Sequence, residues 1–147
     1  MKKLLVLIIL STTLLHCSND DCGDPNITYQ TFTFEIVDKI SGENLFTNGT
    51  YLPEQIQITN TISNFETEFT FLSENNVNLI QVNSASWETD IVNLEFTIAD
   101  ILIFELYSDG DTIVEACYSY TVFNDIFINE SEFDYNAEIA IYTILVE

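Results

Sequence analysis

Apolar and polar residues alternate with a period of two from Tyr29 almost to the end of the chain, and this alternation restricts the fold more than any other feature. Successive side chains of a β-strand point to opposite faces, so the pattern predicts strands with one buried side and one solvent-facing side. No stretch of about 11 residues keeps the 3.6-residue period of an amphipathic helix. We therefore predict an all-β fold with little helix.

The alternation divides into short runs that are separated by turn residues. The inward-facing sets that we expect are Phe32, Phe34 and Ile36; Ile56 and Ile58; Phe65, Thr67, Phe69 and Phe71; and Val92, Leu94, Phe96 and Ile98. A further strand is expected from Val77 to Val82, after a turn at Asn75-Asn76. About seven to nine short strands at near-regular spacing are typical of a sandwich. The prediction is a single antiparallel β-sandwich, immunoglobulin-like or transthyretin-like, that occupies residues 27–147.

Two features of the C-terminal half refine this expectation. Asp109-Gly110 lies between two apolar runs, which is the strongest short-range signal for a β-hairpin turn. In the second arm, Val114, Ala116, Tyr118, Tyr120 and Val122 are expected to face inward, with Cys117 on the outward side. Residues 137 to 146 are apolar on both faces, which predicts a closing strand that is central or covered.

The first residues of the chain are typical of an export signal. Lys2 and Lys3 precede an apolar run from Leu4 to Leu15. As a helix this run would be about 18 Å long, which is too short for a hydrocarbon core of about 30 Å. We therefore predict that residues 1–16 are a cleaved signal peptide rather than a membrane-spanning anchor.

The run Leu14-Leu15-His16-Cys17 resembles the lipobox of bacterial lipoproteins, and this resemblance implies that Cys17 becomes the lipidated first residue. The next residues, Ser18, Asn19, Asp20 and Asp21, resemble the acidic export patch that sends some Gram-negative lipoproteins to the outer face of the outer membrane. The alternative interpretation is a plain solvated tether. The resemblance implies a lipidated acidic tether over 17–26, with the protein anchored in the outer membrane and facing the cell exterior.

A nine-residue run from Val37 to Leu45 also resembles the first hairpin of transthyretin-like and carboxypeptidase-regulatory-like modules. The chain as a whole resembles small lipoproteins of Gram-negative surfaces, which often carry a sandwich on a tether. These resemblances imply a fold and a location, and they imply no activity.

The charge of the chain excludes one class of partner. Once residues 1–16 are removed, a single lysine, Lys39, remains against 24 acidic residues, which gives a net charge of −23, and arginine is absent. Nucleic-acid affinity depends on Lys and Arg displacing counterions from phosphates, so nucleic-acid binding is excluded. The expected partners are the membrane, through the N-terminal lipid, and a protein or glycan; we expect the domain to be a monomer.

Cysteine and histidine usage argues against most enzyme chemistry. With Cys17 assigned to lipid, Cys22 and Cys117 are expected to form one disulfide in an oxidising compartment, the alternative being two thiols. The chain without residues 1–16 has no histidine, so catalytic triads, Cys–His pairs and His-ligated metals lack their residues. A carboxylate pair for glycoside hydrolysis is the one chemistry left, and we predict that the protein is not an enzyme.

Two further candidates remain open. Asp109 and Asp111 are weak candidates for a calcium site, although turn geometry alone explains the Asp-Gly-Asp sequence; no other metal or cofactor is expected. Trp87 could contact a ligand, but closure of one end of the core is favoured. The sequence thus predicts a non-catalytic surface binding or accessory module; the alternatives are a carboxylate-based carbohydrate-active or sugar-binding module, and a calcium-stabilised adhesion module.

Overall fold

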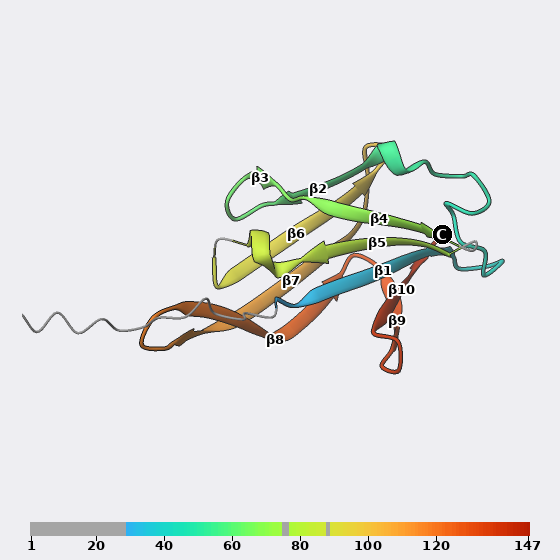
Figure 1. Ribbon diagram of the computed structural model, residues 1–147. Helices are drawn as coiled ribbons and strands as arrows, with labels where there is room; N and C mark the ends of the chain where they lie inside the picture. The colour runs from blue at the N-terminus through green and yellow to red at the C-terminus, as the bar shows by residue number, and fades with distance from the viewer. Residues whose placement is uncertain (1–28, 75–76, 88) are drawn as a thin grey trace, which may run out of the picture.

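The computed structural model describes residues 29–74, 77–87 and 89–147, and these residues confirm the all-β prediction (Figure 1). The strands are β1 (Thr31–Asp38), β2 (Ile56–Asn60), β3 (Phe65–Glu66), β4 (Phe69–Glu74), β5 (Val77–Asn83), β6 (Ile91–Ile98), β7 (Ile101–Val114), β8 (Ser119–Asn129), β9 (Glu132–Asn136) and β10 (Ile141–Val146). Two short 3-10 turns, η1 (Pro53–Gln55) and η2 (Ser84–Ser86), precede β2 and β6. No helix in this part of the chain is long and apolar enough to cross a membrane.

The strands form two five-stranded sheets, as in a β-sandwich. Sheet A has the order β4-β5-β1-β10-β9, and sheet B has the order β3-β2-β6-β7-β8. The pairings are antiparallel except that β1 and β10 run parallel, from Thr33 opposite Ile141 to Asp38 opposite Val146. The wholly antiparallel prediction is therefore wrong at this pair, and the described strands number ten instead of seven to nine.

The last strand occupies the central position that its two apolar faces predicted, because β10 lies between β1 and β9. Its predicted start is wrong, however. Residues 137–140 form a turn that ends with Ala140 at φ +53°, and the strand begins at Ile141. The preceding strand, β9, was not predicted, because all five of its residues are exposed and it contributes nothing to the buried core.

The core forms where the inward faces of the two sheets meet, and its aromatic rings join them. Phe34 of β1 contacts Phe96 of β6 and Phe104 of β7, with ring centroids 5.1 and 5.0 Å apart. Phe96 and Phe104 stack on each other at 4.1 Å. The predicted inward sets of β1, β2 and β6 are all buried. Period-two alternation therefore located the strands that build the core.

One predicted strand divides between the two sheets. The alternating run from Phe65 to Phe71 forms β3 in sheet B and β4 in sheet A, and the chain crosses between the sheets at Thr67 and Glu68. Thr67 is buried at the crossing, whereas Phe65 is 66% exposed. The alternation continues through the crossing, so the sequence pattern does not reveal the change of sheet.

The predicted Asp-Gly hairpin turn is also wrong. β7 continues through Asp109 and Gly110 to Val114, and its register with β8 shifts between these two residues. Gly110 pairs with Phe123, and its backbone comes so close to β8 that an added Cβ would lie 2.6 Å from Thr121 Cγ2. The glycine therefore allows β7 and β8 to approach closely where their pairing is irregular, and no turn forms there.

The hairpin turns five residues later, at 115–118, where the Glu115 N–H donates to the Tyr118 carbonyl at 2.9 Å. Cys117 is exposed, as predicted, but it lies in this turn and not on a strand. Tyr118 and Tyr120 are half-buried and stack on each other at 6.1 Å, and Val114 is 77% exposed. Their predicted core position is wrong because this part of the hairpin projects beyond sheet A (Figure 1).

Gln30 fixes the start of β1 to both sheets. Its carboxamide donates to the Phe123 carbonyl at 2.8 Å and accepts from the Phe123 N–H at 2.7 Å, so the side chain bonds to β8 as a neighbouring strand would. Its backbone N–H donates to Ser84 Oγ at 3.0 Å, and its backbone carbonyl accepts from the Ser84 N–H at 2.9 Å. We call this end of the molecule, with the tip of the β7–β8 hairpin, the entry end.

Candidate functional site

A cleft of about 610 Å³ opens at the end of the molecule opposite the entry end. It is lined by Lys39, Tyr51, Ile101, Leu102, Ile103, Glu130, Ser131, Glu132, Leu145, Val146 and Glu147, and we call it the Lys39 cleft. Tyr51 comes from the connection between β1 and η1, and the other residues come from the end of β1, the start of β7, the β8–β9 connection and the end of β10. Ligand pockets typically measure about 300–1,000 Å³, so the cleft can hold a side chain or a small group of a partner.

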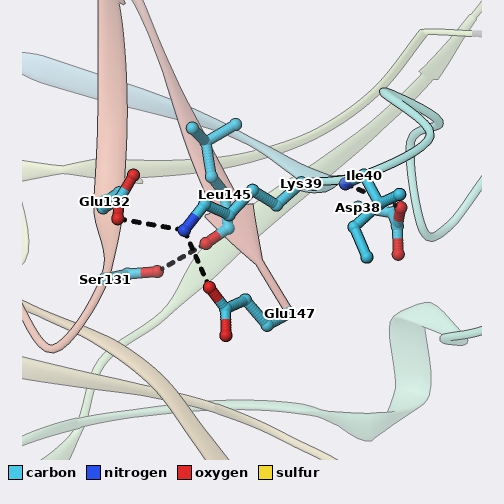
Figure 2. A network of polar contacts seen from close by, with 7 residues as sticks. All are labelled: Asp38, Lys39, Ile40, Ser131, Glu132, Leu145 and Glu147. Atoms are coloured by element: carbon cyan, nitrogen blue, oxygen red, sulfur yellow. Dashed lines mark hydrogen bonds and ion pairs between the residues drawn. The ribbon is translucent and has the colours of Figure 1, made fainter.

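Lys39 is the central polar group of this cleft (Figure 2). Its backbone N–H donates to the Val146 carbonyl at 2.8 Å, which extends the parallel pairing of β1 and β10 by one residue. Its ammonium group donates to Glu132 Oε1 at 3.0 Å and to Glu147 Oε1 at 2.7 Å. Lys39 therefore links the first strand of sheet A to the last two strands of the chain.

The rim of the cleft is built from tight turns. Asp38 accepts hydrogen bonds from the backbone N–H groups of Ile40 at 3.1 Å and Ser41 at 2.6 Å, and the Ser41 bonds lower the pKa of its carboxyl. Ala99 and Asp100 connect β6 to β7 with φ values of +53° and +63°, and Glu130 follows β8 at φ +67°. Non-glycine residues seldom adopt this left-handed conformation, so the rim has a defined and costly backbone shape.

The ion pairs of the cleft favour the charged forms of its lysine and glutamate. Hydrogen bonds from Lys39 to Glu147 and Glu132 raise the pKa of its ammonium, whereas a lysine that acts as a base needs a lowered pKa. The hydrogen bond to Lys39 lowers the pKa of Glu147. A carboxyl that acts as a general acid near neutral pH needs a raised pKa, so Glu147 is shifted in the wrong direction for that role.

A titration checks this network. Because the folded-state pKa of Lys39 is raised, its contribution to stability is complete at neutral pH and is lost as the pH rises through that pKa. We expect the ¹³Cε signal of Lys39 to titrate at a higher pH than that of an ordinary lysine. In the double variant Glu132→Gln and Glu147→Gln the midpoint should fall toward the ordinary value, and an unchanged midpoint would contradict the network.

Trp87, the predicted ligand-contact candidate, follows η2 and packs beside the core. Its ring stacks on Phe32 at 5.3 Å and meets Phe123 edge-on at 4.6 Å. Its buried indole Nε1 has no hydrogen-bond partner among the described residues. The ring lies at the entry end, far from the Lys39 cleft, and a ligand contact by Trp87 stays a prediction.

The calcium candidates lie within β7 and not in a loop. Asp109 faces Asp125 across the β7–β8 pair, and Asp111 accepts a hydrogen bond from Asn124 at 3.1 Å. Asp90, which directly precedes β6, accepts hydrogen bonds from this hairpin, from Thr112 at 2.6 Å and from Thr121 at 2.7 Å. In the part of the chain that the structure describes, no three His, Cys, Asp or Glu residues gather in a group that could hold a metal ion.

The predicted anchor residues lie outside the described residues. These are the signal peptide 1–16, the lipidation site Cys17, the export patch from Ser18 to Asp21, and Cys22. Cys117 lies exposed in the turn between β7 and β8. The Cys22–Cys117 pairing itself stays a prediction.

No family model matches this chain, and no curated protein or solved structure matches it either. The geometry of the site is therefore the basis for its interpretation. Sequence reasoning missed the Lys39 cleft, although one signal was available: Lys39 is the only lysine or arginine after Lys3 in a chain with 24 acidic residues. A lone lysine in such a chain has carboxylate partners within reach, but the sequence does not say which of them fold next to it.

Proposed function

We propose that this protein is a non-catalytic, lipid-anchored surface module that binds a protein or glycan partner at the Lys39 cleft. The sequence supports the anchor: a short charged and apolar leader, a lipobox-like Cys17, and an acidic tether. Lipid chains contribute about 0.8 kcal/mol per buried methylene, so anchoring demands nothing from the domain itself. The proposed location is the outer membrane of a Gram-negative bacterium, with the domain facing the cell exterior.

The observation that supports this function best is the position of the cleft. β1 runs from the entry end to the cleft, and its eight residues at about 3.3 Å each span about 26 Å. A domain that is tethered at the entry end therefore holds its cleft on the side away from the membrane. The acidic charge of the domain adds to this orientation, since anionic lipid headgroups repel it.

The side chains that line the cleft favour recognition of a mixed surface. Ile101 and Leu102 are 57% and 42% exposed at its mouth, next to the Lys39 ion pairs. An apolar contact beside a few oriented charged groups is the usual composition of a binding site. The narrower assignment of the fold to an immunoglobulin-like or transthyretin-like sandwich stays a prediction, because no solved structure matches.

Site-specific photo-crosslinking in the producing cells tests the proposal. A photoreactive amino acid at Leu102 lies in the cleft, and the same group at Val114, at the far end of the same strand, is the matched control. We expect a discrete adduct from position 102 at several times the yield from position 114. Protease and glycosidase sensitivity would then assign the adduct to a protein or a glycan.

The anchor has its own control in the same experiment. The Cys17→Ser substitution removes the proposed lipidation site, so the adduct at position 102 should disappear from the membrane fraction. Equal adduct yields from positions 102 and 114, or no adduct from either, would contradict a binding role for the cleft. An adduct that persists at the membrane without Cys17 would contradict the lipid anchor alone.

A further inference from the structure

The free edge of sheet A has the features of a surface that accepts another strand. β9 pairs with β10 on one side only and is the last strand of its sheet. All five of its residues, from Glu132 to Asn136, are exposed. A strand at the edge of a sheet presents a row of backbone N–H and C=O groups that can pair with another chain.

β9 exposes aromatic rings on the side that continues the core. Phe133 lies opposite the buried Ile144, and Tyr135 lies opposite Tyr142, which contacts the core ring of Phe34 at 5.5 Å. Tyr135 and Tyr142 are in contact with centroids 4.4 Å apart. Phe133 and Tyr135 are nevertheless 40% and 50% exposed, because β9 extends past the strands of sheet B (Figure 1).

The other sheet edges differ from β9 in their length or in the contacts that they make. The edge of β8 is covered at Phe123, where the Gln30 carboxamide takes both backbone groups. β3 is only two residues long. β4 is longer, but its inward ring Phe71 packs edge-on against Phe46 at 5.0 Å and is half-buried. On β9 the two inward rings, Phe133 and Tyr135, are both more than a third exposed, and the strand contains no proline, glycine or lysine, the residues that commonly block strand addition.

The opposite side of β9 is acidic. Glu132 and Asp134 alternate with the two rings, so they project from the outer face of sheet A. Glu132 is bound to Lys39, whereas Asp134 has no basic residue within ion-pair distance among the described residues. Two copies of this chain that paired through β9 would bring these carboxylates together, and like charges on neighbouring strands repel. The charge pattern therefore favours a basic partner over self-association.

We propose that β9 binds an extended segment of a partner protein in which basic and apolar residues alternate. The segment would pair with the β9 backbone as a sixth strand of sheet A, a mode known as β-augmentation. Its apolar side chains would cover Phe133 and Tyr135, and its basic side chains would face Glu132 and Asp134. This inference rests on the proposed function as a binding module, and it specifies the chemistry of a protein partner.

The test uses the acetylated and amidated peptide Lys-Val-Lys-Tyr-Lys-Val, titrated into the whole protein in detergent micelles and followed by amide NMR and hydrogen exchange. Its isomer Lys-Lys-Lys-Val-Tyr-Val, which has the same composition and charge, cannot place basic and apolar residues on opposite faces. We expect slowed exchange at β9 amides with the alternating peptide and at least fivefold weaker binding of the isomer.

Two charge reversals at opposite edges of sheet A separate strand addition from general charge attraction. Asp134→Lys on β9 should weaken binding of the alternating peptide about fivefold or more, whereas Glu74→Lys on β4 should leave it nearly unchanged. Absence of binding at millimolar peptide, equal effects of the two variants, or protection outside β9 would each overturn the inference. The peptide assay does not need the membrane, and its deciding variant, Asp134→Lys, lies outside the lining of the Lys39 cleft, so its failure leaves the crosslinking result intact.

Discussion

Replacing Phe34 with alanine should lower the free energy of unfolding by about 3–5 kcal/mol. Phe34 is fully buried in β1, and its ring touches Phe96, Phe104 and Tyr142, so the substitution opens a cavity where the two sheets meet. Domains of this size have a total stability of about 5–15 kcal/mol, so the loss is a large part of the total. Urea denaturation measures it as a lower midpoint at an unchanged slope.

Phe127→Ala is the matched control, because Phe127 lies on β8 and is 54% exposed. We expect this variant to lose less than about 1 kcal/mol. If Phe34→Ala does not fold, Phe34→Leu keeps the measurement possible with a smaller cavity, and its loss should still exceed that of Phe127→Ala. Similar losses at positions 34 and 127 would contradict the placement of the core.

The position of this core was accessible from the sequence because it depends on local alternation. In β6, Val92, Leu94, Phe96 and Ile98 are all buried, as the two-residue period predicts. The same period continues from Phe65 to Phe71, where the chain leaves one sheet for the other. Alternation reports which side of a strand is buried, but it does not report which sheet the strand joins.

The features that sequence reasoning missed depend on contacts between distant parts of the chain. The parallel pairing of β1 with β10 brings Lys39 beside Glu147, which lies 108 residues later. The Lys39 cleft exists only because this pairing and the β8–β9 connection meet at one end of the molecule. The sequence around Lys39 and around Glu147 does not indicate that the two residues pair. The composition indicates only that a single lysine among many acidic residues will lie close to a carboxylate.

The Asp-Gly turn was also predicted wrongly because the position of Gly110 depends on a contact between two strands, β7 and β8. Substitution of this glycine gives the second large expected effect on stability. Gly110→Ala should lower the free energy of unfolding by about 1–3 kcal/mol, because the added methyl group overpacks the β7–β8 contact. Its Cβ would lie 2.6 Å from Thr121 Cγ2, and 3.0 Å from both Phe123 Cδ1 and the Val122 carbonyl oxygen. Thr121 cannot easily rotate away, since its hydroxyl donates to Asp90 at 2.7 Å. Thermal and urea denaturation of the variant measure the loss.

A second substitution identifies the cause. Thr121→Ser removes the methyl group nearest to the new Cβ and keeps the hydroxyl that binds Asp90, so it should restore part of the stability lost by Gly110→Ala. Recovery should be partial, because the Phe123 and Val122 contacts remain. Gly49→Ala is the control: Gly49 has φ +80° and open space around it, so its loss comes from backbone strain and Thr121→Ser should not restore it. If Thr121→Ser restored the same amount of stability to both glycine variants, Gly110 would be required for its backbone conformation, as in a turn. It would then not be required for the close approach of two strands.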